Sequence, residues 1–152
     1  LGGDVCARNT AENFAKEHNL TIVTLPYLNN HYRKCDDGYG DIRLKEVSPE
    51  AFVSLIKYAD FIFTDSFHGT VFSGVFNRHF VVFGRDDYIE MEGRIKSLLQ
   101  LFNAAKCFCD SNEKKSIKYI DKIYSETVNY NTQILIENIN ASKEFLEKAL
   151  EV

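Results

Sequence analysis

The sequence predicts an α/β fold built on a parallel, doubly wound sheet. Short apolar runs, typical of buried strands, alternate with segments whose apolar residues recur every three to four positions, as on one face of a helix. Successive strand–helix–strand units place neighbouring strands parallel to each other. With 152 residues and 45% hydrophobic content, the chain has the length and the core of one domain, which we expect to span residues 1–152.

The first third of the chain opens this alternation. Residues 1–4 have the pattern of a strand end, a helical pattern follows to about His18, and the apolar run Leu20–Leu25 predicts the next strand. Residues 26–46 are polar and lack a period, so they predict a long surface loop or lid.

The middle of the chain predicts two helices and two strands. Ser48 followed by Pro49 is typical of a helix start, with the serine as N-cap and the proline at the first helical position. The run Phe61–Phe63 then predicts a strand buried on both faces of the sheet. A helix over Thr70–Phe76 and a strand over His79–Phe83 are expected to follow.

The last third predicts one more strand and three helices. The strand is expected at Ala105–Cys109, and the helices are expected at Arg94–Phe102, Lys114–Tyr124 and about Val128–Leu150. The final helix is long and amphipathic, so its apolar face should pack on other elements; a break near Asn138 or Asn140 is the alternative.

Composition argues against several classes of partner. The net charge is −4 and the basic residues are dispersed, which leaves no electrostatic footprint for nucleic acid or an anionic membrane. No apolar run approaches the ~20 residues of a membrane-spanning helix, and no secretory leader opens the sequence. We therefore expect a soluble protein with no transmembrane segment and no nucleic-acid partner. Its expected location is the cytoplasm, including the inner face of the membrane.

The cysteines predict neither a metal site nor disulfides. Cys6, Cys35, Cys107 and Cys109 lack the C-x-x-C pairing of zinc and redox sites, so we expect reduced thiols. Cys107 and Cys109 would face the same way on a strand, but no nearby histidine completes a ligand set. The G-x-G-x-x-G fingerprint is also absent, so no metal and no dinucleotide cofactor are expected.

The most informative segment is Asp60–Phe76, DFIFTDSFHGTVFSGVF. A buried strand there runs into a polar turn and then directly into a helix. The unpaired amides of such a helix point into the crevice beyond the carboxyl end of the strand, where they favour an anion. The turn also contains His68, and histidine is the side chain that exchanges protons near neutral pH.

This segment resembles the polysaccharide pyruvyl transferase family, in which a D-S-F-H-G turn follows a strand of the second domain and precedes a helix. The resemblance extends over Ser48–Leu101 and includes Phe80–Arg85 (FVVFGR) and Arg94–Leu101 (RIKSLLQL). It implies a Rossmann-like domain equivalent to the C-terminal half of a two-domain, GT-B-like transferase, with a long C-terminal helix and with the N-terminal domain absent from this chain.

The resemblance implies transfer of the enolpyruvyl group of phosphoenolpyruvate onto a sugar of a surface polysaccharide as a pyruvate ketal. Phosphoenolpyruvate is the donor substrate, and no cofactor is implied. A proton must reach the methylene carbon of the donor, and His68 is the expected catalytic residue. The acceptor would be a glycan or a sugar linked to a lipid or nucleotide, contacted largely by the N-terminal domain, so the isolated fragment could bind donor without turnover.

The carboxylate and phosphate of the donor need cationic and amide partners. Arg85 and Arg94 follow the next strand, on the side where the strands' carboxyl ends open. Backbone amides from Phe67 to Thr70 would complete a phosphate cradle. The expected substrate-binding residues are Asp65, Ser66, Phe67, Gly69, Thr70, Arg85 and Arg94.

Each of these residues has a purely structural alternative. His68 could cap its own helix or form a hydrogen bond inside the core. Asp65 and Ser66 are ordinary N-cap residues. Arg85 and Arg94 could be solvated partners of nearby acidic residues.

Two other functions stay open at this point. A serine hydrolase would use Ser66 as nucleophile, but the G-x-S-x-G elbow is absent and His68 is badly placed to act as its base. The second alternative is a glycosyltransferase-like module that binds a nucleotide sugar or another anion without pyruvyl transfer.

Overall fold

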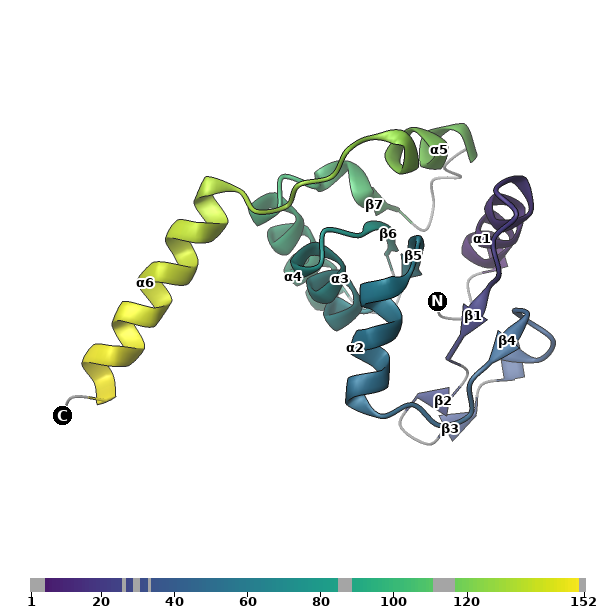
Figure 1. Cartoon of the computed structure of the whole chain (residues 1–152), viewed down its shortest axis with the longest axis horizontal. Helices are drawn as coiled ribbons and strands as arrows, with labels where there is room; N and C mark the ends of the chain where they lie inside the picture. The colour runs from purple at the N-terminus through teal and green to yellow at the C-terminus, as the bar shows by residue number, and fades with distance from the viewer. Residues whose placement is uncertain are drawn as a thin grey trace.

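Three parallel strands form the main sheet of the computed structural model, which describes residues 5–25, 27–28, 31–32, 34–84, 89–110 and 117–150. These strands, β5 (Phe61–Thr64), β6 (His79–Phe83) and β7 (Phe108–Cys109), are arranged in the order β5-β6-β7 (Figure 1). Helices alternate with them along the chain. The predicted α/β class with parallel strands is therefore confirmed.

Helices cover both faces of the main sheet (Figure 1). On one face, Phe14 of α1 (Val5–Glu17) lies with its ring centroid 4.7 Å from that of Phe61, and α1 packs beside α5 (Ile117–Ser125). The other face carries α3 (Phe67–Val75) and α4 (Ile89–Leu101). This arrangement agrees with the predicted helices on both sides of the sheet.

The core is centred on β6, where Phe80, Val81 and Val82 have no exposed surface. By contrast, the residues of Phe61–Phe63 are only half-buried, although the sequence predicted a strand buried on both faces. The reason is position in the sheet, because β6 lies between two neighbours whereas β5, within the part of the chain that the structure describes, pairs with β6 alone.

The N-terminal region differs most from the prediction. The strand expected over Leu20–Leu25 is reduced to β1 (Val23–Thr24), which pairs in parallel with β4 (Ile42–Arg43) in a separate sheet. The expected loop at residues 26–46 contains β4 and, in addition, the elements β2 (Tyr27–Leu28), β3 (His31–Tyr32) and η1 (Lys34–Asp36). Residues 1–4, the expected strand end, lie outside the described residues.

Long-range contacts fix this region in place. The buried guanidinium of Arg8 in α1 forms an ion pair with the buried carboxylate of Asp36 and lies 4.6 Å from the centroid of the Tyr39 ring. Burial raises the pKa of Tyr39 to about 12. The Asp41 carboxylate accepts a hydrogen bond of 2.8 Å from the Ile22 amide, beside the β1–β4 pair.

The remaining helices are present as predicted, but α4 (Ile89–Leu101) begins five residues before its predicted start and the last helix begins five residues after its own. The helix α2 (Pro49–Tyr58) begins as predicted, with Ser48 as its N-cap. The strand expected at Ala105–Cys109 is wrong in its first part, since Ala105–Cys107 form the 3₁₀ turn η2 and only Phe108–Cys109 pair with β6. Because η2 occupies the first three of these residues, only two extended residues are left to pair with β6.

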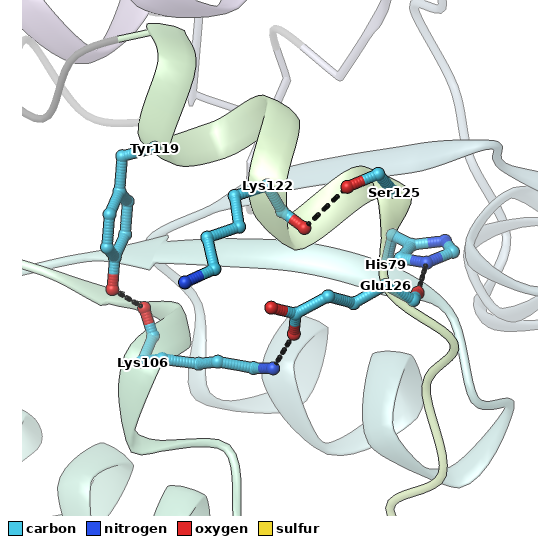
Figure 2. Close-up of polar contacts among 6 residues, drawn as sticks. All are labelled: His79, Lys106, Tyr119, Lys122, Ser125 and Glu126. Atoms are coloured by element: carbon cyan, nitrogen blue, oxygen red, sulfur yellow. Dashed lines mark hydrogen bonds and ion pairs between the residues drawn. The ribbon is translucent and has the colours of Figure 1, made fainter.

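Polar contacts hold the end of α5 against η2 and β6 (Figure 2). Lys106 forms an ion pair with Glu126, and the Tyr119 hydroxyl donates to the Lys106 carbonyl at 2.6 Å. The imidazole Nε2 of His79, the first residue of β6, lies 2.7 Å from the Glu126 carbonyl oxygen. Together with the buried Ile120 and Ile123, these contacts hold α5 on the sheet.

The last helix, α6 (Gln133–Leu150), extends away from the rest of the molecule as one unbroken helix (Figure 1). Its N-terminus is capped and anchored, because the Thr132 hydroxyl accepts a hydrogen bond from the Leu135 amide at 3.1 Å and donates one to the Leu101 carbonyl. None of its residues is buried, and Phe145 is 71% exposed. Leu135, in the first turn, is partly buried against the core, so the prediction that the apolar face of this helix packs on other elements holds there and is wrong for the rest of the helix.

In the part of the chain that the structure describes, each helix is too short or too polar to cross a membrane.

Candidate functional site

The candidate site is the turn that joins β5 to α3. Ser66 is the N-cap of α3, with extended backbone angles (φ −98°, ψ 133°) and a side-chain oxygen that accepts from the Gly69 amide at 3.3 Å. The hydroxyl of the fully buried Thr70 donates to the Ser66 carbonyl at 2.9 Å. The helix therefore begins at Phe67, three residues before the predicted start, because a serine cap fixes its first turn.

Gly69 is required by close packing inside this turn. A Cβ atom at this position would lie 2.5 Å from the Thr64 side-chain oxygen, well inside van der Waals contact. The same Thr64 oxygen accepts a hydrogen bond of 3.1 Å from the Ser66 amide. Thr64 thus holds the strand end and the helix start together, a role that the sequence analysis missed because nothing distinguishes it from any other last residue of a strand.

Two backbone amides remain available at the start of α3. The Gly69 and Thr70 amides donate to Ser66, at 3.3 and 2.9 Å. The amides of Phe67 and His68 have no acceptor among the residues described here. Because the N-terminus of a helix carries partial positive charge, the environment of these two N–H groups at the carboxyl end of β5 favours an anion.

His68 is exposed at this position. Its ring lies edge-on to that of Phe67, with 5.8 Å between the centroids. It does not cap α3, since Ser66 does so, and within the described part of the chain its side chain has no hydrogen-bond partner. The imidazole is therefore accessible to a solute that binds at the two amides.

Arg94 reaches the same turn from α4. Its guanidinium carbon lies 4.5 Å from the centroid of the Phe67 ring. The neighbouring Glu92 forms an ion pair with Lys96 instead of with Arg94. The structure thus brings Arg94 and Phe67, the neighbour of His68, together at one turn as the sequence predicted, and it adds the contact of the guanidinium with the Phe67 ring.

The other predicted site residues have different settings. Asp65 follows β5 directly and is 7% exposed, and Ser66 is half-buried. Arg85 lies outside the described residues. A nucleophilic role for Ser66 has no support from its setting, because its side-chain oxygen accepts a capping hydrogen bond and no described histidine bonds to it.

The cysteine and acidic residues add no second site. Burial raises the pKa of Cys107 to about 11, so this thiol stays protonated and unreactive near neutral pH. Across residues 5–150, with the undescribed segments left aside, no three His, Cys, Asp or Glu side chains come together as metal ligands.

Comparison with known proteins gives one match. The family model described as polysaccharide pyruvyl transferase matches residues 5–87, which is more than half of the chain and includes the whole β5–α3 turn. No curated protein and no solved structure matches the chain.

Proposed function

This chain belongs to the polysaccharide pyruvyl transferase family, and from that membership we propose that it moves the enolpyruvyl group of phosphoenolpyruvate onto a sugar of a surface polysaccharide as a pyruvate ketal. The observation that carries the proposal is the β5–α3 turn. It offers two amides that have no acceptor among the described residues, an exposed histidine and an arginine at one position. That combination of groups suits an anionic donor.

The donor would bind through its two acidic groups. The amides of Phe67 and His68 receive the phosphate, where the partial charge of the helix terminus favours an anion. The planar guanidinium of Arg94 suits a carboxylate or a phosphate in a two-pronged hydrogen bond, and Arg85 is proposed to share that task. Gly69 and Thr70 act indirectly, since their amides hold the turn in shape.

His68 would supply the proton. Protonation of the methylene carbon leaves a cationic centre at the neighbouring carbon, and one sugar hydroxyl attacks it and loses its proton. The second hydroxyl then displaces the phosphate, so that two C–O bonds to the sugar form, one C–O bond to phosphate breaks and inorganic phosphate leaves. A histidine beside the bound donor can give and take these protons near neutral pH.

The acceptor side of the reaction is proposed to lie on a facing N-terminal domain, in a two-domain, GT-B-like arrangement. The apolar face of α6 supports such a partner, because Phe145, Leu146 and Leu150 are 71%, 57% and 84% exposed. A patch of this kind marks an interaction surface more often than a solvated one. The acceptor would be a glycan or a sugar on a lipid or nucleotide carrier, and no cofactor is proposed.

Calorimetric titration of phosphoenolpyruvate into the chain tests the donor site. Binding in the micromolar to millimolar range is expected, with inorganic phosphate as a competitor. Arg94→Ala should weaken it by ~1–3 kcal/mol, as for the loss of a hydrogen bond to a charged group. Arg43→Ala, which removes an exposed arginine of β4, is the matched control and should have no effect.

Two outcomes separate the proposal from its alternative. Preference for a nucleotide sugar over phosphoenolpyruvate would favour an anion- or nucleotide-sugar-binding module. Equal loss of binding in Arg94→Ala and Arg43→Ala would show that only the overall charge matters, and the placement of the donor at the turn would be wrong.

A further inference from the structure

We propose that Phe67 is a positioning residue whose ring holds the guanidinium of Arg94 beside the start of α3, with the N–H edge of the arginine directed at the bound anion. The proposal rests on the proposed function, because that function makes Arg94 a ligand of the donor. It adds a role for a side chain whose backbone alone had been expected to bind.

The geometry is that of a cation placed over an aromatic ring. The Arg94 guanidinium carbon lies 4.5 Å from the Phe67 centroid, within the ~6 Å range of cation–π contacts. The Phe67 side chain is half-buried and packs against the hydrophobic core, so the ring is a fixed surface. Arg94 is exposed, and its guanidinium lies over that surface.

Among the described residues, Phe67 is the group that contacts the Arg94 guanidinium. The adjacent carboxylate of Glu92 is engaged by Lys96, and within the described part of the chain Arg94 has no ion pair. A guanidinium that stacks through its face keeps the donors around its edge available for a ligand. A carboxylate partner would instead have occupied those donors and neutralised the charge.

Phe67 also contributes directly to the anion position, since its own amide is one of the two without an acceptor. One residue therefore places a backbone N–H and a side-chain cation at the same turn. The two helices involved are held closely, because Gly74 of α3 lies against the Phe102 ring at the end of α4, where a Cβ would come within 2.2 Å. The stack is thus built on a rigid contact between α3 and α4.

The experiment is a double-mutant cycle on phosphoenolpyruvate binding, measured by calorimetry on the same chain. Phe67→Leu keeps an apolar side chain but removes the aromatic face, and it should weaken binding about two- to tenfold, the worth of one cation–π contact. Phe67→Tyr keeps the face and should bind within about twofold of the original chain. In an Arg94→Ala background, Phe67→Leu should have no further effect.

The coupling between Phe67 and Arg94 distinguishes a ring that positions the arginine from a ring that only supports the fold. If Phe67→Leu weakens binding equally with and without Arg94, the ring acts through the fold and the proposal is overturned. It is also overturned if Phe67→Leu binds like the original chain. Thermal unfolding of each variant, followed by circular dichroism, identifies any variant that has lost its fold.

A second measurement does not depend on the donor. Side-chain NMR should show the Arg94 δ protons shifted upfield by the Phe67 ring current, with the shift lost in Phe67→Leu and kept in Phe67→Tyr. Absence of that shift in the original chain would overturn the proposal even if phosphoenolpyruvate binds. Presence of the shift in a chain that binds inorganic phosphate but not phosphoenolpyruvate would leave the stack standing and contradict the proposed function.

Discussion

The helices α3 and α6 are both predicted by apolar periodicity, yet only one of them is packed. Each begins at a hydroxyl cap, Ser66 for α3 and Thr132 for α6. The helix α3 buries Gly69, Thr70 and Ser73 against the sheet and its neighbours, whereas α6 buries none of its residues. Periodicity therefore predicts that a helix forms and which face is apolar, but it does not identify what covers that face.

The difference in packing between α3 and α6 has a functional consequence. The β5–α3 turn is fixed by hydrogen bonds that Ser66 accepts, by the close approach of Gly69 to Thr64 and by packing of α3 on β6, in which Phe80, Val81 and Val82 are fully buried. A ligand position needs that degree of order, because misplacement of its donors weakens binding. The exposed α6, in contrast, is where we propose that another protein domain packs.

The largest expected effect contrasts the two regions directly. Phe80→Ala in β6 should destabilise the chain by about 3–5 kcal/mol, because the side chain has no exposed surface and packs against Tyr130. Phe145→Ala in α6 should change the free energy of unfolding by less than about 0.5 kcal/mol. Urea unfolding followed by circular dichroism measures both, and a comparable cost for the two would mean that α6 is packed in solution.

The pH dependence of stability contrasts the buried thiol of Cys107 with the same thiol in the unfolded chain. In the unfolded chain Cys107 should ionise near its ordinary pKa of 9, whereas burial raises the pKa of the folded thiol to about 11. Between these values the unfolded state loses a proton that the folded state keeps, so stability should fall by about 2–3 kcal/mol as pH rises through that window and should be unaffected below it.

Urea unfolding of the original chain and of Cys107→Val at pH 8 and pH 11 measures this contribution. The variant lacks the buried thiol, so it should lose less stability than the original chain over the same interval. An equal loss in both proteins would show that other groups, such as lysines and tyrosines, account for the alkaline sensitivity.

Alanine substitutions at Gly74 and Gly93 compare a packed helix surface with an open one. Gly74→Ala should cost about 1–3 kcal/mol, because its Cβ would meet the Phe102 ring at 2.2 Å. Gly93→Ala, at a position of α4 with open space around it, should instead stabilise the chain by about 0.5–1 kcal/mol. Thermal unfolding midpoints of the two variants should thus move in opposite directions, and a shift in the same direction would contradict the α3–α4 contact.

The smallest effect concerns the cap of the candidate site. Ser66→Ala should destabilise the chain by about 1 kcal/mol, because the Gly69 amide loses its acceptor. Ser142→Ala in α6 is the matched control, since its exposed hydroxyl only donates to the Asn138 carbonyl, and it should leave stability unchanged. Urea unfolding measures the free energy of unfolding of both variants. Equal losses would mean that the Ser66 cap contributes no more to stability than the exposed hydroxyl of Ser142.

The parts of the fold that were predicted correctly are those with strong local signals. The strand His79–Phe83 was predicted to the residue, because a continuous apolar run lies between the helix end at Asn77, which has a positive φ, and Gly84. The start of α2 was equally clear from Ser48 and Pro49. Local chemistry alone determines these elements.

The parts that were missed depend on long-range contacts. The two-residue strands of residues 26–46 have no periodicity, and their region is held by the Arg8–Asp36 ion pair and by the Asp41 bond to Ile22. The turn with His68 could be predicted from its D-S-F-H-G pattern. The Phe67–Arg94 stack could not, because it depends on how α4 crosses α3.

Amide NMR during titration with phosphoenolpyruvate shows whether the donor binds at the β5–α3 turn. The amide resonances of Phe67 and His68 should shift most and saturably, with inorganic phosphate shifting the same pair and with α6 unaffected. Saturable shifts confined to another region, such as the surface around Phe145, or binding that leaves both turn amides unchanged, would contradict the placement of the donor site at the β5–α3 turn.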